Sequence, residues 1–138
     1  MRAHWLKGIG HARASLPEAW LTDGAAAVLV RTGFPRRPRM TPGDRLVYYA
    51  AGWRKVFAVV EVVGEPTDTV AHTTNPARWP WSVPVEALLV VPHLENAPPV
   101  EAIGVAARSM SQQSHIRIDA GHYGRAVDAL ASVAAVER

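Results

Sequence analysis

The sequence contains no cysteine. Disulfide bonds, thiolate zinc sites and cysteine nucleophiles are therefore excluded, and the composition fits a reducing cytoplasm. The first residues, MRAHW, show no signal-peptide pattern. The longest uncharged apolar runs, such as residues 25–30, are far shorter than the roughly 18 residues of a membrane-spanning helix. We therefore expect a soluble, cytoplasmic protein that has no membrane partner.

Sequence patterns of common catalytic sites are also lacking. The chain has no glycine-rich phosphate loop followed by Lys-Ser/Thr, no dinucleotide-binding fingerprint and no G-x-S-x-G nucleophile elbow. Its six histidines include no pair at i, i+4 with an intervening glutamate, although His4, His11 and His115 could cluster in space. No pair of acidic residues is held together for acid–base chemistry. We therefore expect no catalytic residues, no metal and no cofactor.

The chain does have enough apolar sequence for a folded core. It is 138 residues long and 49% hydrophobic, which predicts a single domain over residues 1–138. The formal net charge is only +3, but the charges are unevenly distributed. The segment RTGFPRRPRM contains Arg31, Arg36, Arg37 and Arg39 without an intervening acid. This segment is either a solvated loop or a rim that contacts phosphates.

The pattern of apolar residues and turn signals predicts an α+β fold. Strands are expected at residues 3–9, 45–51, 55–64, 78–91 and 111–118. Short helices are expected at residues 15–21 and 97–107, and a longer helix after Asp119. Residues 25–32 fit either a strand or a continued helix, and their β-branched end favours a strand. Five or six mostly antiparallel strands with two or three helices indicate a small barrel-like domain.

Residues 43–66, GDRLVYYAAGWRKVFAVVEVVGEP, have the pattern of a β-hairpin. The second strand is apolar on both faces, as expected where a strand has a barrel interior on one side and a helix on the other. Trp53 lies on the turn, next to Arg54 and Lys55, where it is difficult to bury whole. An indole beside cations suits stacking on a nucleobase, worth roughly 1–3 kcal/mol, while the cations meet phosphates. The alternative, which holds for each of the five tryptophans, is that the indole fills the core.

Short motifs follow one another along nearly the whole chain. They are HWLK (4–7), RMTPGDRLVYYA (39–50), VVGEPTD (62–68), NPARW (75–79) and RSMSQQSHIRIDAGHYGRAVDAL (108–130). In this order they resemble the EVE domain of the PUA-like superfamily, which also contains the YTH and ASCH domains. The second motif is nearest to an uncharacterised bacterial branch of that family.

The resemblance implies a PUA-like β pseudobarrel of about five to six mostly antiparallel strands with two to three flanking helices. It also implies a pocket for a single altered nucleobase, such as methylated or hydroxymethylated cytosine, which enters flipped from its stack or single-stranded. Two segments depart from the family: residues 8–10 replace a serine and a small acidic loop, and residues 20–33 lack a matching asparagine. Because both segments help to line the family's pocket, the identity of the ligand is left open.

We predict that this pocket combines three kinds of side chain. The aromatic wall would be Trp5, Tyr48, Tyr49, Trp53 and Trp81. Polar readers of the base edge would be Lys7, Ser111 and Gln113. The phosphate-contacting rim would be Arg31, Arg36, Arg37, Arg39, Arg54 and Lys55.

The leading hypothesis is thus a non-catalytic reader domain that binds DNA, RNA or a modified nucleobase, as a monomer or a weak dimer. A second hypothesis is a hydrolase that acts on a nucleotide-like small molecule in the same pocket, although Ser109 and Ser111 have no base partner nearby in sequence. A third is a protein-interaction domain that uses the prolines of residues 80–99, with a flat apolar patch and no deep aromatic pocket.

Overall fold

Six strands form one mixed sheet in the order β2-β5-β4-β3-β1-β6. The computed structural model describes residues 2–10, 14–72 and 75–137. The strands are β1 (His4–Ile9), β2 (Arg31–Phe34), β3 (Arg45–Ala50), β4 (Lys55–Val62), β5 (Trp81–Val90) and β6 (His115–Ile118). β1 and β3 pair in parallel, whereas the other neighbouring strands pair antiparallel. The predicted α+β pseudobarrel is confirmed.

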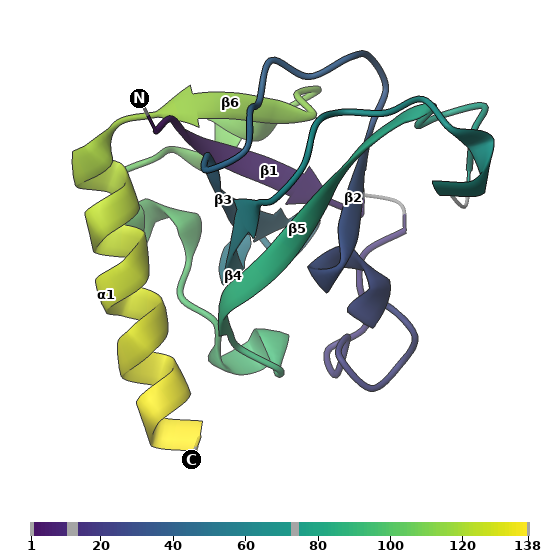
Figure 1. The fold of residues 1–138 in the computed structure, drawn as a ribbon. Helices are drawn as coiled ribbons and strands as arrows, with labels where there is room; N and C mark the ends of the chain where they lie inside the picture. The colour runs from purple at the N-terminus through teal and green to yellow at the C-terminus, as the bar shows by residue number, and fades with distance from the viewer. Residues whose placement is uncertain (1, 11–13, 73–74, 138) are drawn as a thin grey trace.

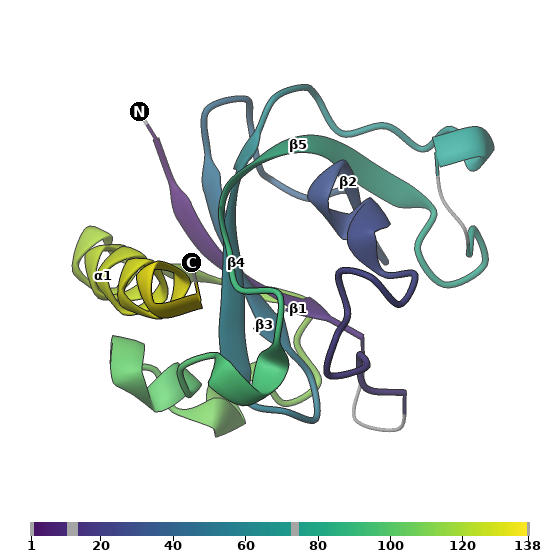
Figure 2. The ribbon, with the colours of Figure 1, turned by 90° about the horizontal axis from the view of Figure 1, so that it is seen from below.

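The sheet curls until its two edge strands approach each other (Figure 1, Figure 2). The Phe34 ring at the end of β2 meets the His115 ring at the start of β6 edge-on, with a centroid separation of 5.1 Å. The Lys7 ammonium of β1 lies 4.8 Å from the Phe34 centroid. The two edges are thus joined through side chains instead of a backbone ladder, which leaves room between them.

The flanking helices are short except for the last one. α1 (Ala120–Glu137) packs against η4, β4 and β5, and its Ala126 and Leu130 are fully buried. Asp119 caps this helix as predicted, because its Oδ1 accepts the His122 backbone N–H at 2.7 Å. The 3₁₀ segments are η1 (Ala26–Leu29), η2 (Val70–His72), η3 (Leu94–Asn96), η4 (Val100–Ile103) and η5 (Ala107–Met110). No helix of the described chain is both long and apolar enough to cross a membrane.

The predicted hairpin is present and forms the centre of the core. β3 ends at Ala50 and β4 begins at Lys55. The side chains from Val56 to Val60 are all fully buried, which agrees with the apolar character of this strand on both faces. The core is therefore built around β4, in the middle of the sheet.

The helix expected at residues 15–21 is wrong, because this segment forms turns. The Glu18 carboxylate does not cap a helix: it accepts the Glu95 N–H at 3.0 Å and bonds to His93 Nδ1 at 2.9 Å. Trp20 Nε1–H donates to the Val91 carbonyl at 2.9 Å. These distant partners hold the segment in an irregular conformation, which local sequence signals do not reveal.

Two further boundaries differ from the expectation. Within residues 25–32 the strand reading holds only for Arg31 and Thr32, whereas Ala26–Leu29 form the separate 3₁₀ segment η1 and continue no helix. Residues 97–107 do not form one helix, because η4 ends at the left-handed Gly104 (φ 87°) and an extended stretch follows. Glycine tolerates this conformation, which terminates the turn.

Candidate functional site

A cavity of ≈ 1020 Å³, which we call the main cavity, opens at the carboxyl end of β1. Its described lining comes from residues 7–10 and 16, from parts of 27–35 and 49–54, from 72 and 78–79, and from parts of 107–114. The Gly8 N–H donates to Ser114 O at 2.9 Å, and the Ala51 N–H donates to Ile9 O at 3.1 Å. These bonds place the 107–114 segment and the β3–β4 turn on opposite sides of β1. The main cavity therefore occupies the gap between the strand edges.

The charge of the main cavity is of one sign. Lys7, Arg31, Arg54, Arg78 and Arg108 line it, and no aspartate or glutamate is among its described lining residues. Arg31 is held by hydrogen bonds to Ser82 Oγ (3.1 Å) and Thr67 Oγ1 (3.4 Å). Such an uncompensated group of cations attracts anions.

The guanidinium groups of Arg54, Arg78 and Arg108 have no internal partner of opposite charge. Within the described residues they form no ion pair and no hydrogen bond. The Arg78 guanidinium lies 5.3 Å from the centroid of the Trp79 ring. These three cations are exposed and available to a ligand.

Lys7 differs from these arginines because it is buried. Only 5% of its surface is exposed, and its Nζ donates to Gly8 O at 2.7 Å. Burial lowers the pKa of Lys7 to about 7. Burial, followed by the Lys7 charge, also lowers the pKa of His115. A protonated Lys7 has three N–H donors, and the Gly8 carbonyl accepts from one of them. The remaining N–H groups could donate to an acceptor on a ligand.

Two aromatic side chains, Tyr49 and Trp79, line the main cavity. Trp79 packs closely on β2, since a Cβ atom at Gly33 would lie 3.0 Å from the Trp79 Cβ. Burial raises the pKa of Tyr49, and the nearby Arg54 charge opposes that effect. The Tyr49 hydroxyl therefore stays protonated at neutral pH and can donate a hydrogen bond.

Uncharged polar side chains complete the lining. Ser111, Gln112 and Gln113 lie on the turn after η5. Thr32 is buried beside the Tyr48 hydroxyl, which donates a hydrogen bond to the Val28 carbonyl. The main cavity thus contains hydrogen-bonding groups that the fold itself does not use.

The predicted site residues are divided between the main cavity and other places. Those that line it are Lys7, Tyr49, Ser111, Gln113, Arg31 and Arg54. The part that each plays in binding stays a prediction. Residues 8–10 and part of 27–33, where the sequence departs from the EVE pattern, also line the main cavity.

Four aromatic residues of the predicted wall are not among the described lining residues. Tyr48 is instead a fully buried core residue. Trp53 Nε1–H donates to Leu16 O at 2.8 Å, and this bond holds the indole half-buried against the protein. Trp5 Nε1–H donates to Asp44 Oδ2 at 3.2 Å. Trp81 is half-buried beneath Arg37, whose Cζ lies 5.2 Å from its ring centroid.

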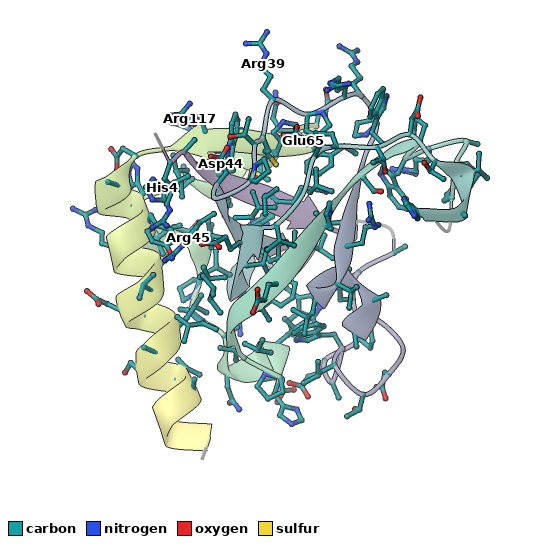
Figure 3. The ribbon with its side chains drawn as sticks, in the orientation of Figure 1. His4, Arg39, Asp44, Arg45, Glu65 and Arg117 are labelled. Carbon is teal, nitrogen blue, oxygen red and sulfur yellow. The ribbon has the colours of Figure 1, made fainter. Side chains whose placement is uncertain are left out.

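The remaining cations of the predicted rim also lie outside the main cavity. Arg36, Arg37 and Arg39 are exposed on the loop between β2 and β3, and Figure 3 shows Arg39 projecting away from the ribbon. The Lys55 ammonium donates to Leu94 O at 3.0 Å and Glu95 O at 2.9 Å. Lys55 therefore attaches η3 to the hairpin, whereas the loop arginines can contact an extended ligand.

Sequence reasoning missed several lining residues: His72, Arg78, Trp79, Arg108 and Gln112. The NPARW motif contained Arg78 and Trp79, and the RSMSQQSH run contained Arg108 and Gln112. An arginine directly before a tryptophan was the available signal. The sequence did not favour Trp79 over Trp81, because both tryptophans offer an indole that can stack on a base.

The histidines do not form a metal site in the described structure. No group of three or more His, Cys, Asp or Glu side chains suited to a metal lies within residues 2–10, 14–72 and 75–137. The His4 ring stacks on Tyr123, with centroids 4.4 Å apart. His115 contacts Trp5 and Phe34. His11, the third histidine of the cluster considered from sequence, lies outside the described residues.

No family model and no curated protein matches the chain. Solved structures do match it over most of its length. A hypothetical protein from Leishmania major has a TM-score of 0.56 at 13% identity and covers 100% of this chain and 98% of its own.

Two further structures were determined with nucleic acid. Human THYN1 in complex with 5-methylcytosine-containing DNA has a TM-score of 0.53 at 13% identity, with coverage of 91% of this chain and 96% of that chain. The YTH domain of Zygosaccharomyces rouxii MRB1 in complex with N6-methyladenosine RNA has a TM-score of 0.55 at 9% identity, with coverage of 91% and 85%. At these identities the likeness shows the fold alone, a curled α+β pseudobarrel.

Proposed function

We propose that this protein is a non-catalytic reader domain of the EVE family that binds one modified nucleobase of DNA or RNA in the main cavity. The EVE motifs in the sequence support the family, and the PUA-like fold agrees with it. The same fold holds 5-methylcytosine-containing DNA in the THYN1 complex and N6-methyladenosine RNA in the YTH complex.

The observation that carries the proposal is the composition of the main cavity. Lysine and arginine side chains line it together with Tyr49 and Trp79, and its described lining contains no carboxylate. Its volume of ≈ 1020 Å³ is at the upper end of the about 300–1,000 Å³ typical of ligand pockets. It therefore offers space for a flipped base together with its sugar and phosphate.

Each kind of lining side chain has a role in this binding mode. The Trp79 indole stacks on the base, an interaction that accepts any base because every base has a π-face. Lys7, Ser111 and Gln113 hydrogen-bond to the base edge and select the modification. Arg31, Arg54, Arg78 and Arg108 contact the flanking phosphates, which position the strand without reading its sequence.

The hydrolase alternative has one feature in its favour. Ser114, which lines the main cavity, has its Oγ 3.2 Å from His115 Nδ1. No carboxylate of the described lining orients this imidazole, as a serine nucleophile would need. Ser109 lines a separate open groove with Asp119 and His122. We therefore favour a reader.

The test is a binding titration by fluorescence anisotropy with labelled single-stranded oligonucleotides. Three probes are identical except for one cytosine, 5-methylcytosine or 5-hydroxymethylcytosine, and a fourth carries N6-methyladenosine. We expect saturable binding with a preference for one modified base. Trp79→Ala should weaken that binding by about 1–3 kcal/mol, because a stacking surface is lost.

Arg125→Ala on α1 is the matched control, since Arg125 does not line the main cavity. Circular dichroism should confirm that both variants are folded. Binding that ignores every modification and disappears with added salt would reduce the function to nonspecific phosphate contact. If Trp79→Ala and the wild-type protein bound the oligonucleotides with equal affinity, the base would not bind in the main cavity.

A further inference from the structure

Two residues other than glycine have a left-handed backbone in the described chain. They are Arg54 and Gln112, both with φ of 59°. This conformation is unfavourable for such residues, because the Cβ atom crowds the following carbonyl oxygen. Both residues line the main cavity. Backbone strain of this kind concentrates at ligand-binding sites, so the shared location needs a physical reason.

Gln112 occupies a turn position that glycine fits best. The Gln113 N–H donates to Met110 O at 3.1 Å, which closes a four-residue turn. Ser111 has φ −61° and ψ 122°, and the positive φ of Gln112 follows. This is a type II β-turn, whose third residue is normally glycine. A glutamine at this position costs conformational free energy relative to glycine. We infer that the glutamine side chain has a function that offsets this cost.

Arg54 completes the turn between β3 and β4. Its N–H donates to Ala50 O at 3.0 Å, and its carbonyl accepts the Val100 N–H at 3.0 Å. Gly52, with φ of 86°, supplies the other left-handed position of this turn. A glycine at position 54 would make the same backbone bonds without strain. The backbone therefore does not account for an arginine.

The two side chains have no partner within the described protein. The Gln112 amide and the Arg54 guanidinium form no hydrogen bond or ion pair with the described residues, and both residues are exposed. The turns that carry them lie on opposite sides of the end of β1, because Ala51 bonds to Ile9 and Ser114 bonds to Gly8. They therefore flank the main cavity.

We propose that Gln112 and Arg54 contact the ligand directly: the Gln112 amide hydrogen-bonds to the edge of the bound base, and the Arg54 guanidinium holds a neighbouring phosphate. This inference rests on the proposed function and adds Gln112 to its specificity-determining residues. An amide offers a donor and an acceptor side by side, which matches a base edge. A guanidinium matches phosphate geometry. The strained turns are retained because they direct these two groups into the main cavity.

Glycine substitution separates the structural from the binding role, because it relieves the backbone while it removes the side chain. We expect Gln112→Gly and Arg54→Gly to keep the thermal unfolding midpoint or raise it by a few degrees. With the oligonucleotides described above, Arg54→Gly should weaken binding to modified and unmodified probes equally, by about tenfold. It should also reduce the slope of log K against log salt by about 0.7, the value for one phosphate contact on a single strand.

Gln112→Gly should act differently, because the amide carries no charge. We expect the salt slope to stay unchanged, while the preference for the modified over the unmodified probe falls by about tenfold. Gln112→Asn, which tolerates the left-handed backbone and keeps a shorter amide, should retain part of the preference. Arg125→Ala serves as the control for loss of one positive charge outside the main cavity.

The outcomes are distinguishable. Stable glycine variants with unchanged affinity, slope and preference would overturn the inference and leave the proposed function intact. Glycine variants that unfold would also overturn it, because the side chains would then be structural. A wild-type protein that binds no oligonucleotide at low salt would overturn the proposed function, and the inference with it.

Discussion

The two ends of β1 differ in how their polar groups are paired. At the amino end, the buried Asp44 carboxylate accepts the Ala3 N–H at 3.0 Å, the Trp5 Nε1–H at 3.2 Å and the Thr41 N–H at 3.2 Å. The Arg117 guanidinium lies 5.3 Å from the centroid of the Trp5 ring. Figure 3 shows Asp44 and Arg117 on the same edge of the molecule. Donors, acceptors and aromatic faces are used internally at this end.

The carboxyl end of β1 is the opposite case. There the guanidinium groups of Arg54, Arg78 and Arg108 form no ion pair and no hydrogen bond in the described structure. Groups that are satisfied by the fold stabilise it, whereas groups that the fold leaves unsatisfied are available to a ligand. The start of β1 therefore contributes to stability, and we propose that its end contributes to binding.

Substitution of Asp44 should have the largest effect on stability. Asp44→Ala leaves three buried or half-buried donors without their acceptor, so we expect the free energy of unfolding to fall by about 3 kcal/mol. Urea denaturation measures this change. Asp44→Asn keeps one acceptor oxygen and should cost less. If Asp44→Ala kept full stability but lost oligonucleotide binding, the amino end of β1 would serve binding and not stability, contrary to this prediction.

Lys7 should make the free energy of unfolding depend on pH. Burial lowers its pKa in the folded protein to about 7, from a usual value of 10.5. Between these two pH values the unfolded chain binds more protons than the folded protein, so stability rises as the pH increases from about 7 to 10.5. Below pH 7 the charged form must be buried, and stability is lowest.

Lys7→Met should remove that dependence and raise the free energy of unfolding at pH 6 by on the order of 3 kcal/mol. Urea denaturation of both proteins at pH 6, 8 and 10 is the measurement. Parallel pH profiles for the two proteins would contradict the burial of a neutral amine. Lys7→Arg, which cannot lose its proton at these pH values, should be the least stable of the three.

Arg108 should show the smallest effect on stability. Its exposed side chain has no internal hydrogen bond or ion pair in the described structure, so Arg108→Ala should change the free energy of unfolding by less than about 0.5 kcal/mol. The slope of log K against log salt for binding of the single-stranded oligonucleotides should fall by about 0.7. An unchanged slope would show that this guanidinium contacts no phosphate.

The hairpin was predictable from sequence because its signals are local. Alternating and continuous apolar runs on either side of Gly52 identify β3 and β4. The partner of Trp53 was not predictable, because its indole N–H donates to Leu16 O, far away in the chain. The position of Trp53 on a turn suggests exposure, but the hydrogen bond to Leu16 holds its indole against a distant loop whose position the sequence does not reveal.

The segment at residues 15–21 shows the limit of local signals more clearly. Ser15 and Glu18 have the spacing of a helix capping box, but Glu18 bonds to His93 and to the Glu95 backbone instead. A surface helix of this length would gain about 1 kcal/mol from such a cap. The tertiary contacts, together with the buried Trp20, outweigh that gain.

The sequence predicted the kinds of side chain in the candidate site better than it predicted the particular residues. Aromatic, polar and cationic residues were expected, and each kind lines the main cavity. The choice of Trp79 over Trp81 depends on β2, because Trp79 packs over Gly33. The role of the 107–114 segment depends on its bond to Gly8. Such contacts between distant segments are set by the curled sheet, which a single sequence does not specify.

The pairing of β1 with β6 also has a consequence for folding. This pairing joins His4 to Ile118, and contacts between residues so far apart in the chain form late, because a long loop must first be closed. The β3–β4 hairpin needs only a short turn and can form early. We therefore expect the chain to acquire its core before the 107–114 segment reaches Gly8. The lining of the main cavity that this segment supplies would then be the last to assemble.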